Sequence, residues 1–247
     1  MFGKFSRKDA PSQESLSAAD PMLAAKLGGR VILERLLGSM KDERGVHVES
    51  LATALGALAG RACQLAALEG LRSGASEYRG LSLMTAGGAN GDEYFVGDAI
   101  NRPLAESQYS FWGLVAGAAH QHGAQVPDLN ELFQHSASTL GGEAFGLPRF
   151  APGTNAGDTP RGYLALWEPL LPALRQAAPR QDQWPVAYGV AVQNLFAMAK
   201  GHFDLGVLTR VVMDSAIGTS KLKLPVEPAA PLAPAPPQAK LHPRGRS

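Results

Sequence analysis

Hydrophobic residues recur every three or four positions through most of this chain, which is the period of an amphipathic α-helix. The first such series follows Asp20, a capping residue, and Pro21, which suits a first helical turn. It includes Leu23 and Leu27 and continues to Met40. The pattern predicts a mainly α protein with a single domain of about seven helices. They are expected at residues 20–40, 48–71, 105–122, 128–140, from 159 onward, 182–200 and 204–217.

Prolines, glycines and short polar side chains mark where these helices should begin, bend and end. Asp128 and Asp204 are expected N-caps, because their carboxylates accept bonds from the free N–H groups of a first turn. Pro169 and Pro172 should kink or split the fifth helix. Gly218 is expected to end the last helix, since glycine is the usual residue beyond a helix C-terminus.

Residues 81–103 depart from the helical pattern. They contain two short β-prone runs, Leu81–Thr85 and Glu93–Val96, which are separated by a glycine-rich stretch that includes Asn90 and Gly91. An Asn-Gly pair favours a tight hairpin turn, because both residues tolerate positive φ. The sequence therefore predicts one β-hairpin, at about residues 81–97, embedded in the helical domain.

Two of the predicted helices carry glycines four positions apart. Gly56 and Gly60 lie in the second helix, and Gly113 and Gly117 lie in the third. Glycine inside a helix costs about 1 kcal/mol relative to alanine, so another contribution must offset it. We expect close helix–helix crossings at both pairs. A membrane-type dimer face is the alternative, and the polar flanking residues disfavour it.

The segment 143–158 has no periodic pattern and is rich in glycine and proline, which predicts a long loop. Loops of this length inside compact domains are often functional. Three apolar residues within it, Phe145, Leu147 and Phe150, predict that the loop is held against the body of the protein.

Both ends of the chain have compositions typical of disorder. Residues 1–19 are polar, and residues 224–247 are rich in Pro and Ala and have a basic end. We therefore expect one helical domain at about residues 20–223 between two disordered ends. The Pro-rich tail is a candidate for docking a partner.

Composition narrows the classes of function. The chain has 247 residues, 45% of them hydrophobic, and a formal net charge of +1, which disfavours binding to nucleic acid. Cys63, the only cysteine, lies among small helical residues and is expected to be a buried thiol rather than a nucleophile. The sequence shows no signal peptide and no run of about 20 apolar residues, so we expect no transmembrane segment. A cytoplasmic protein, bacterial by its Ala/Gly/Leu-rich composition, is the expectation.

The candidate catalytic residues are Glu131 and His135, which lie four positions apart on one face of the fourth helix. A carboxylate can orient an imidazole and raise its pKa, as in general acid–base pairs. The structural alternative is that Glu131 helps to cap the helix. His120 and His122 lie two positions apart and face different directions, so we expect no metal site, and nothing in the sequence indicates a cofactor.

The candidate ligand-binding residues are Asp98, Asn101 and Arg102 at the exit from the hairpin, together with Arg149 in the long loop. Arginine suits recognition of an anionic group. The structural alternative is a local ion pair between Asp98 and Arg102 that fixes the turn.

No G-x-S-x-G motif, phosphate-binding loop or G-x-G-x-x-G fingerprint occurs in the sequence. The prediction is therefore a non-enzymatic protein that binds a protein partner or assembles into a homo-oligomer. The main alternative is an enzyme with a polar pocket near the hairpin exit and residues 143–158. Convergence of the candidate residues in one pocket would favour the enzyme, and their separation would favour the binding protein.

Overall fold

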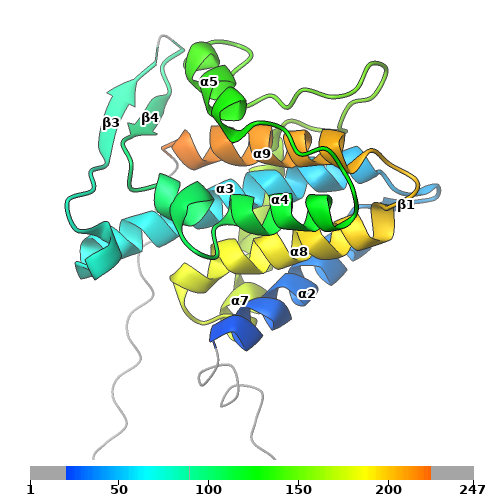
Figure 1. Ribbon diagram of the computed structural model, residues 1–247, viewed down its shortest axis with the longest axis horizontal. Coiled ribbons are helices and arrows are strands. Elements are labelled where there is room, and N and C mark those ends of the chain that lie inside the picture. Colours follow the sequence, from blue (N-terminus) through cyan, green and yellow to red (C-terminus); the bar gives the residue numbers. More distant parts are fainter. Residues whose placement is uncertain (1–20, 89, 224–247) are drawn as a thin grey trace, which may run out of the picture.

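In the computed structural model, which describes residues 21–88 and 90–223, helix α3 (Val48–Ser73) runs through the middle of the molecule (Figure 1). Its side chains are buried on almost every face, and Leu51, Leu55 and Leu58 are at most 1% exposed. Burial on all faces is expected of a helix that is apolar all round. Helices α8 (Trp184–Ala199) and α9 (Leu205–Lys221) pack directly on α3.

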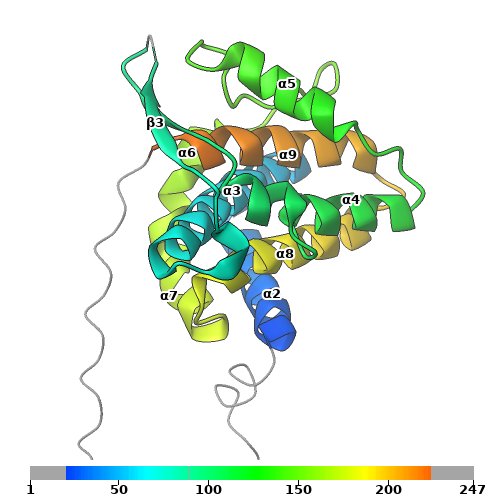
Figure 2. The same cartoon turned by 60° about the vertical axis from the view of Figure 1, so that its left-hand side comes forward.

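The mainly α single domain is confirmed, and 64% of the described residues are helical. Four further helices of eleven or more residues surround the central three. They are α2 (Pro21–Ser39), α4 (Phe111–Gln121), α5 (Leu129–Thr139) and α7 (Trp167–Ala177), with a single turn, α6 (Pro160–Tyr163), before α7. Helix α2 packs on α7 and α8, α4 packs on α8, and α5 lies across α9 (Figures 1 and 2).

The crossing of α3 with α9 confirms the expectation for Gly56 and Gly60. A Cβ atom on Gly56 would lie 2.3 Å from the carbonyl oxygen of Val212, and one on Gly60 would lie 2.3 Å from the carbonyl oxygen of Ala216. The contacts advance along both helices together, so α3 and α9 run parallel. The backbones approach so closely that only glycine fits at either position.

The expectation for Gly113 and Gly117 is wrong. Both glycines are exposed on α4, and a Cβ atom on Gly117 would have no neighbour within 4 Å. The buried face of α4 is formed instead by Phe111, Val115 and Ala119. The glycines lie on the opposite face, so no helix crosses them.

The predicted hairpin is present, with strands β3 (Met84–Gly87) and β4 (Glu93–Val96) paired antiparallel. The second strand has its predicted bounds, whereas the first begins three residues later than expected. Gly91 has a φ of +81°, as the turn prediction requires. A second small hairpin, β1 (Lys41–Asp42) and β2 (Gly45–Val46), connects α2 to α3.

Three helix boundaries differ from the predicted ones. Helix α4 begins at Phe111 rather than near residue 105, because residues 102–106 form a short π-helical turn and Ser110 is the N-cap. The fifth helix divides at residues 164–166, before its prolines. Gly218 lies inside α9 and does not end it. A Cβ atom there would lie 2.4 Å from the Cα atom of Gly146, so the absence of a side chain at Gly218 allows the long loop to pack against α9.

Two polar residues of α3 are buried beside the end of α9. The amide of Gln64 donates to the carbonyl oxygens of Ser220, at 3.1 Å, and of Leu222, and its own oxygen accepts from Arg61. By length and composition α3 is apolar enough to cross a membrane, and 94% of its most apolar window is buried inside the molecule. Arg61 and Gln64, the polar residues within this apolar helix, thus satisfy each other and the last carbonyl groups of α9 by hydrogen bonding.

The expected disordered ends, residues 1–19 and 224–247, lie outside the described residues, so the limits of the domain stay a prediction. Within the described part, the segment 143–158 contains no helix or strand, as expected of a loop. Phe150 packs against the hydrophobic core, and Phe145 contacts Tyr94 of β4. The loop is therefore held against the body of the protein.

Cys63 is fully buried in α3, as the sequence predicted, and burial raises the pKa of its thiol because the thiolate would lose its hydration. We expect no reaction with Ellman's reagent in the native protein and one equivalent released after denaturation. Absorbance at 412 nm measures both quantities. Rapid labelling of the native protein would contradict this burial.

Candidate functional site

Arg149 fastens the long loop to helices α5 and α9. Its Nη2 and Nε atoms donate to Asp214 of α9 at 2.8 and 2.9 Å, and its backbone N–H donates to the same carboxylate at 3.1 Å. Its Nη1 atom pairs with Glu131 of α5. The Asp214 side chain is 2% exposed, and its buried carboxylate pairs with the guanidinium group of Arg149. Two of the candidate residues, Glu131 and Arg149, therefore meet, and they do so in a structural clamp.

The pKa of the Glu131 carboxyl is lowered, chiefly by its hydrogen bond with Arg149. Asp128 caps α5 by accepting a hydrogen bond from the Asn130 N–H at 2.8 Å. The carboxylate of Glu131 pairs instead with Arg149 of the long loop. His135 lies close enough to Glu131 to contribute to that lowering. Glu131 thus interacts more strongly with Arg149 than with His135.

The hairpin exit forms a separate place. Asp98 accepts a hydrogen bond from the Ser82 N–H at 2.7 Å, and Arg102 donates to the Glu77 carbonyl oxygen at 3.0 Å. The local ion pair between Asp98 and Arg102 is not among the contacts of the described residues. Asn101 leads into the π-helical turn. The candidate residues are consequently divided between the hairpin exit and the loop clamp.

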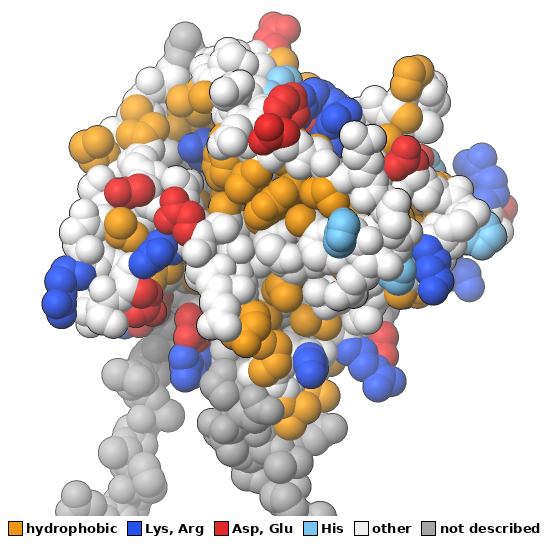
Figure 3. Space-filling view, viewed as in Figure 1, with side chains coloured by type: hydrophobic (Ala, Val, Ile, Leu, Met, Phe, Trp, Pro, Cys, Tyr) orange, Lys and Arg blue, Asp and Glu red, His pale blue; other side chains and the backbone are white. Residues whose placement is uncertain are grey.

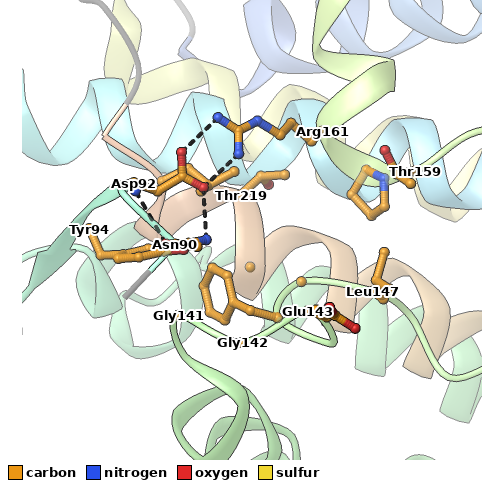
Figure 4. Close-up of a pocket in the computed structure, with 15 residues that line it drawn as sticks. Asn90, Asp92, Tyr94, Gly141, Gly142, Glu143, Leu147, Thr159, Arg161 and Thr219 are labelled. Atoms are coloured by element: carbon orange, nitrogen blue, oxygen red, sulfur yellow. Dashed lines mark hydrogen bonds and ion pairs between the residues drawn. The ribbon is translucent and has the colours of Figure 1, made fainter. Parts of the chain in front are cut away.

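A cavity of ≈ 530 Å³ lies beside the turn of the hairpin, and we call it the hairpin pocket (Figure 4). It is built by the turn of the hairpin and β4, the beginning of the long loop, the start of α6 and the end of α9. None of the six candidate residues lines it. The lining residues are Asn90, Asp92, Tyr94, Gly141, Gly142, Glu143, Phe145, Gly146, Leu147, Thr159, Pro160, Arg161, Gly218, Thr219 and Leu222.

The wall of the hairpin pocket is mostly apolar. Tyr94 is 1% exposed and meets Phe145 edge to face, with the ring centroids 5.0 Å apart. Leu147 stands on the other side of the pocket and is 43% exposed. Gly146 has a φ of +73° and brings the loop onto Gly218 of α9. The result is an open site with aromatic and aliphatic surface and accessible backbone.

The polar groups at the pocket rim are bonded to one another. Arg161 donates to both carboxylate oxygens of Asp92, at 2.6 and 2.9 Å, and this pairing lowers the pKa of Asp92. The Asn90 amide donates to Asp92 at 3.1 Å and to the Tyr94 hydroxyl at 2.8 Å (Figure 4). Thr219 donates to the Ala57 carbonyl oxygen at 2.9 Å. These hydrogen bonds link the hairpin turn to α6 at the rim and the end of α9 to α3.

A second cavity, of ≈ 1030 Å³, lies at the C-terminal end of α3 and includes Arg102. Four arginines and four carboxylates line it, so its charge is balanced. Arg72 pairs with Glu69 at 2.7 Å, and Arg180 pairs with Asp182. Burial, its largest cause, raises the pKa of Tyr78 to about 12. An anionic ligand here would compete with carboxylates that are already in place.

The face shown in Figure 3 carries a gathering of hydrophobic side chains near its centre, between the levels of α5 and α4. Partly buried side chains of these two helices, including Trp112, Leu129 and Phe133, pack against the core. This surface continues the core outward, whereas the hairpin pocket has a defined cavity.

The sequence predicted a possible ligand site near the hairpin exit and residues 143–158, and Glu143, Phe145, Gly146 and Leu147 of that segment do line the hairpin pocket. None of the residues named as site candidates does. The turn residues Asn90 and Asp92 were visible only as a hairpin signal. Arg161 is 69 positions from Asp92, and nothing local links the two. Comparison with protein family models, curated proteins and solved structures found no match.

Proposed function

We propose that this protein is a non-enzymatic binding module whose hairpin pocket receives an extended, apolar segment of a partner protein. The observation that carries the proposal is the pocket itself, which is lined by Phe145 and the exposed Leu147, with the buried Tyr94 packed edge to face against Phe145. Two of its three charged lining residues, Asp92 and Arg161, are already paired with each other.

The chemistry of the walls favours a segment with proline or aliphatic side chains. Proline-rich segments bind grooves that are lined by aromatic side chains, because their extended conformation exists before binding and costs little entropy. Phe145 supplies such a surface and is held in place by its contact with the buried Tyr94. Leu147 lines the pocket and is 43% exposed, and Leu140, next to the lining residue Gly141, is 38% exposed, so apolar surface is accessible there.

The separation of the candidate residues also supports binding over catalysis. Glu131, His135 and Arg149 lie at the loop clamp, whereas Asp98 and Arg102 lie at the hairpin exit. Within residues 21–88 and 90–223, no histidine, cysteine or lysine lines the hairpin pocket, and no group of three potential metal ligands occurs. Self-assembly and a cytoplasmic location are further parts of the proposal.

The test is selection of proline-containing 12-residue peptides on the full chain from a displayed library, followed by affinity measurement with variants. Leu147→Asp is expected to weaken the selected peptide at least tenfold, because a charge would replace apolar surface at the site. Loss of one buried leucine contact costs about 1.5–3 kcal/mol. Isothermal titration calorimetry measures the change.

Met198→Asp is the matched control, since Met198 is 51% exposed on α8 and does not line the pocket. It is expected to leave peptide affinity unchanged. Peptides that bind both variants as well as the wild type would place the interaction elsewhere, and failure to select any peptide would count against the proposed function.

A further inference from the structure

The end of α9 delivers the chain directly to the hairpin pocket. Leu222 forms an antiparallel bridge with Tyr94 of β4. The Lys223 N–H donates to the Glu93 carbonyl oxygen at 2.9 Å, and its ammonium group pairs with the Glu93 carboxylate at 2.9 Å. The last described residues therefore lie along the edge of β4 that is not paired with β3.

The direction of this pairing is informative. Because the bridge is antiparallel, the chain from Leu222 to Lys223 advances as β4 is read backward, from Tyr94 to Glu93. The next positions in that direction are Asp92 and the turn residue Asn90, and both line the hairpin pocket. Leu222 lines it as well. The last described residues thus lie beside the pocket.

The sequence that follows has a strict three-residue period. Prolines occupy positions 225, 228, 231, 234 and 237 in the stretch PVEPAAPLAPAPP. A polyproline II helix has three residues per turn, so this spacing places the five prolines on one face. Such a face is the ligand that aromatic-lined grooves recognise. The chain therefore carries, next to the pocket, a segment of the class that the pocket suits.

We propose that the segment 225–237 covers the hairpin pocket of its own chain, so that a partner must displace it. The inference rests on the proposed function and adds a regulatory element to it. A short connection gives a tethered segment an effective concentration of about 1 mM, so even a weak contact would cover the pocket much of the time. An outside ligand then binds with an affinity reduced by the covered fraction.

The first measurement compares ¹⁵N–¹H NMR spectra of the full chain with those of a variant in which Pro228, Pro231 and Pro234 are replaced by serine. Changes are expected at the pocket glycines Gly141, Gly142, Gly146 and Gly218, and none at the remote Gly113 and Gly117. A second variant, A229S/A233S/P236S, removes an out-of-phase proline and is expected to resemble the wild type.

Adding the free peptide 225–237 to the P228S/P231S/P234S chain should restore the wild-type positions of the pocket glycines. The library-selected peptide should also bind this variant at least threefold more tightly than it binds the wild type. If the pocket signals of the wild type change with protein concentration, a second copy supplies the segment. That result would contradict the proposal that the segment covers the pocket of its own chain.

Identical pocket signals and identical peptide affinities in wild type and P228S/P231S/P234S would overturn the inference as well. The proposed function would stand in that case if the selected peptide still depended on Leu147. If peptide binding did not depend on Leu147 either, both proposals would be wrong. The two failures are therefore distinguishable.

Discussion

Replacing Gly60 with alanine is expected to lower the free energy of unfolding by about 1–3 kcal/mol, the usual cost of overpacking, because the contact atoms are largely backbone. A Cβ atom at this position would lie 2.1 Å from the Thr219 hydroxyl oxygen and 2.3 Å from the Ala216 carbonyl oxygen. Relief requires α9 to move away from α3, and α9 is also held by Gln64 and by the loop at Gly218. Urea denaturation followed by circular dichroism measures the change.

Gly117→Ala is the matched control. The substitution is chemically identical, but the added methyl group has no neighbour within 4 Å. It should raise the free energy of unfolding by up to about 1 kcal/mol, because alanine is the better helix former. Equal effects from the two substitutions would show that helix propensity, and not the crossing of α3 with α9, decides the outcome.

Replacing Arg149 with methionine is expected to cost about 3 kcal/mol, the lower end of the range for breaking a buried ion pair. The lower end applies because the arginine side chain is 30% exposed, although that of Asp214 is only 2% exposed. In Arg149→Met the Asp214 carboxylate would remain buried and would lose the two hydrogen bonds from the guanidinium group. Only the bond from the backbone N–H of residue 149 would remain.

Arg161→Met provides the comparison, since the ion pair between Arg161 and Asp92 lies at the surface, with the arginine side chain 60% exposed. It should cost less than about 1 kcal/mol. Thermal and urea unfolding of both variants at pH 7 distinguish the two cases. If Arg149→Met is as mild as Arg161→Met, the loop clamp contributes little to stability.

The clamp also predicts a dependence on pH. Arg149 lowers the pKa of Glu131 in the folded state, so the folded protein holds on to its charged carboxylate more strongly than the unfolded chain does. The resulting stability is present above the unfolded pKa of about 4.3 and is lost as the pH falls through the lower folded value. This contribution should disappear in Arg149→Met.

The difference between the two glycine pairs shows what helical spacing can and cannot reveal. Gly56 and Gly60 belong to a helix that is apolar on all sides, so any face of it meets a neighbour. Helix α4 is only partly buried, and its core side is marked by Phe111, Val115 and Ala119. Glycines at positions 113 and 117 fall about 200° away from that side, so the sequence already held the correct answer.

The site was harder to predict because its contacts join distant parts of the chain. The Arg161–Asp92 pair spans 69 positions, and the Arg149–Asp214 pair spans 65. Sequence reasoning offered Asp98 as a partner for Arg102 because the two are four residues apart, yet each bonds instead to backbone groups elsewhere. Local spacing predicted the hairpin and the loop, but only the packing of α6 and α9 between them creates the pocket.

The parallel pairing of α3 with α9 has a consequence for biosynthesis. The bond from Thr219 to the Ala57 carbonyl oxygen joins residues 162 positions apart, so the apolar central helix gains its main partner only when synthesis of the domain is almost complete. Until then the face of α3 that α9 covers stays exposed in the nascent chain, on a helix with membrane-like hydropathy. Contacts between such distant residues also form slowly. A ribosome that stopped before α9 would release an aggregation-prone fragment instead of a smaller folded domain.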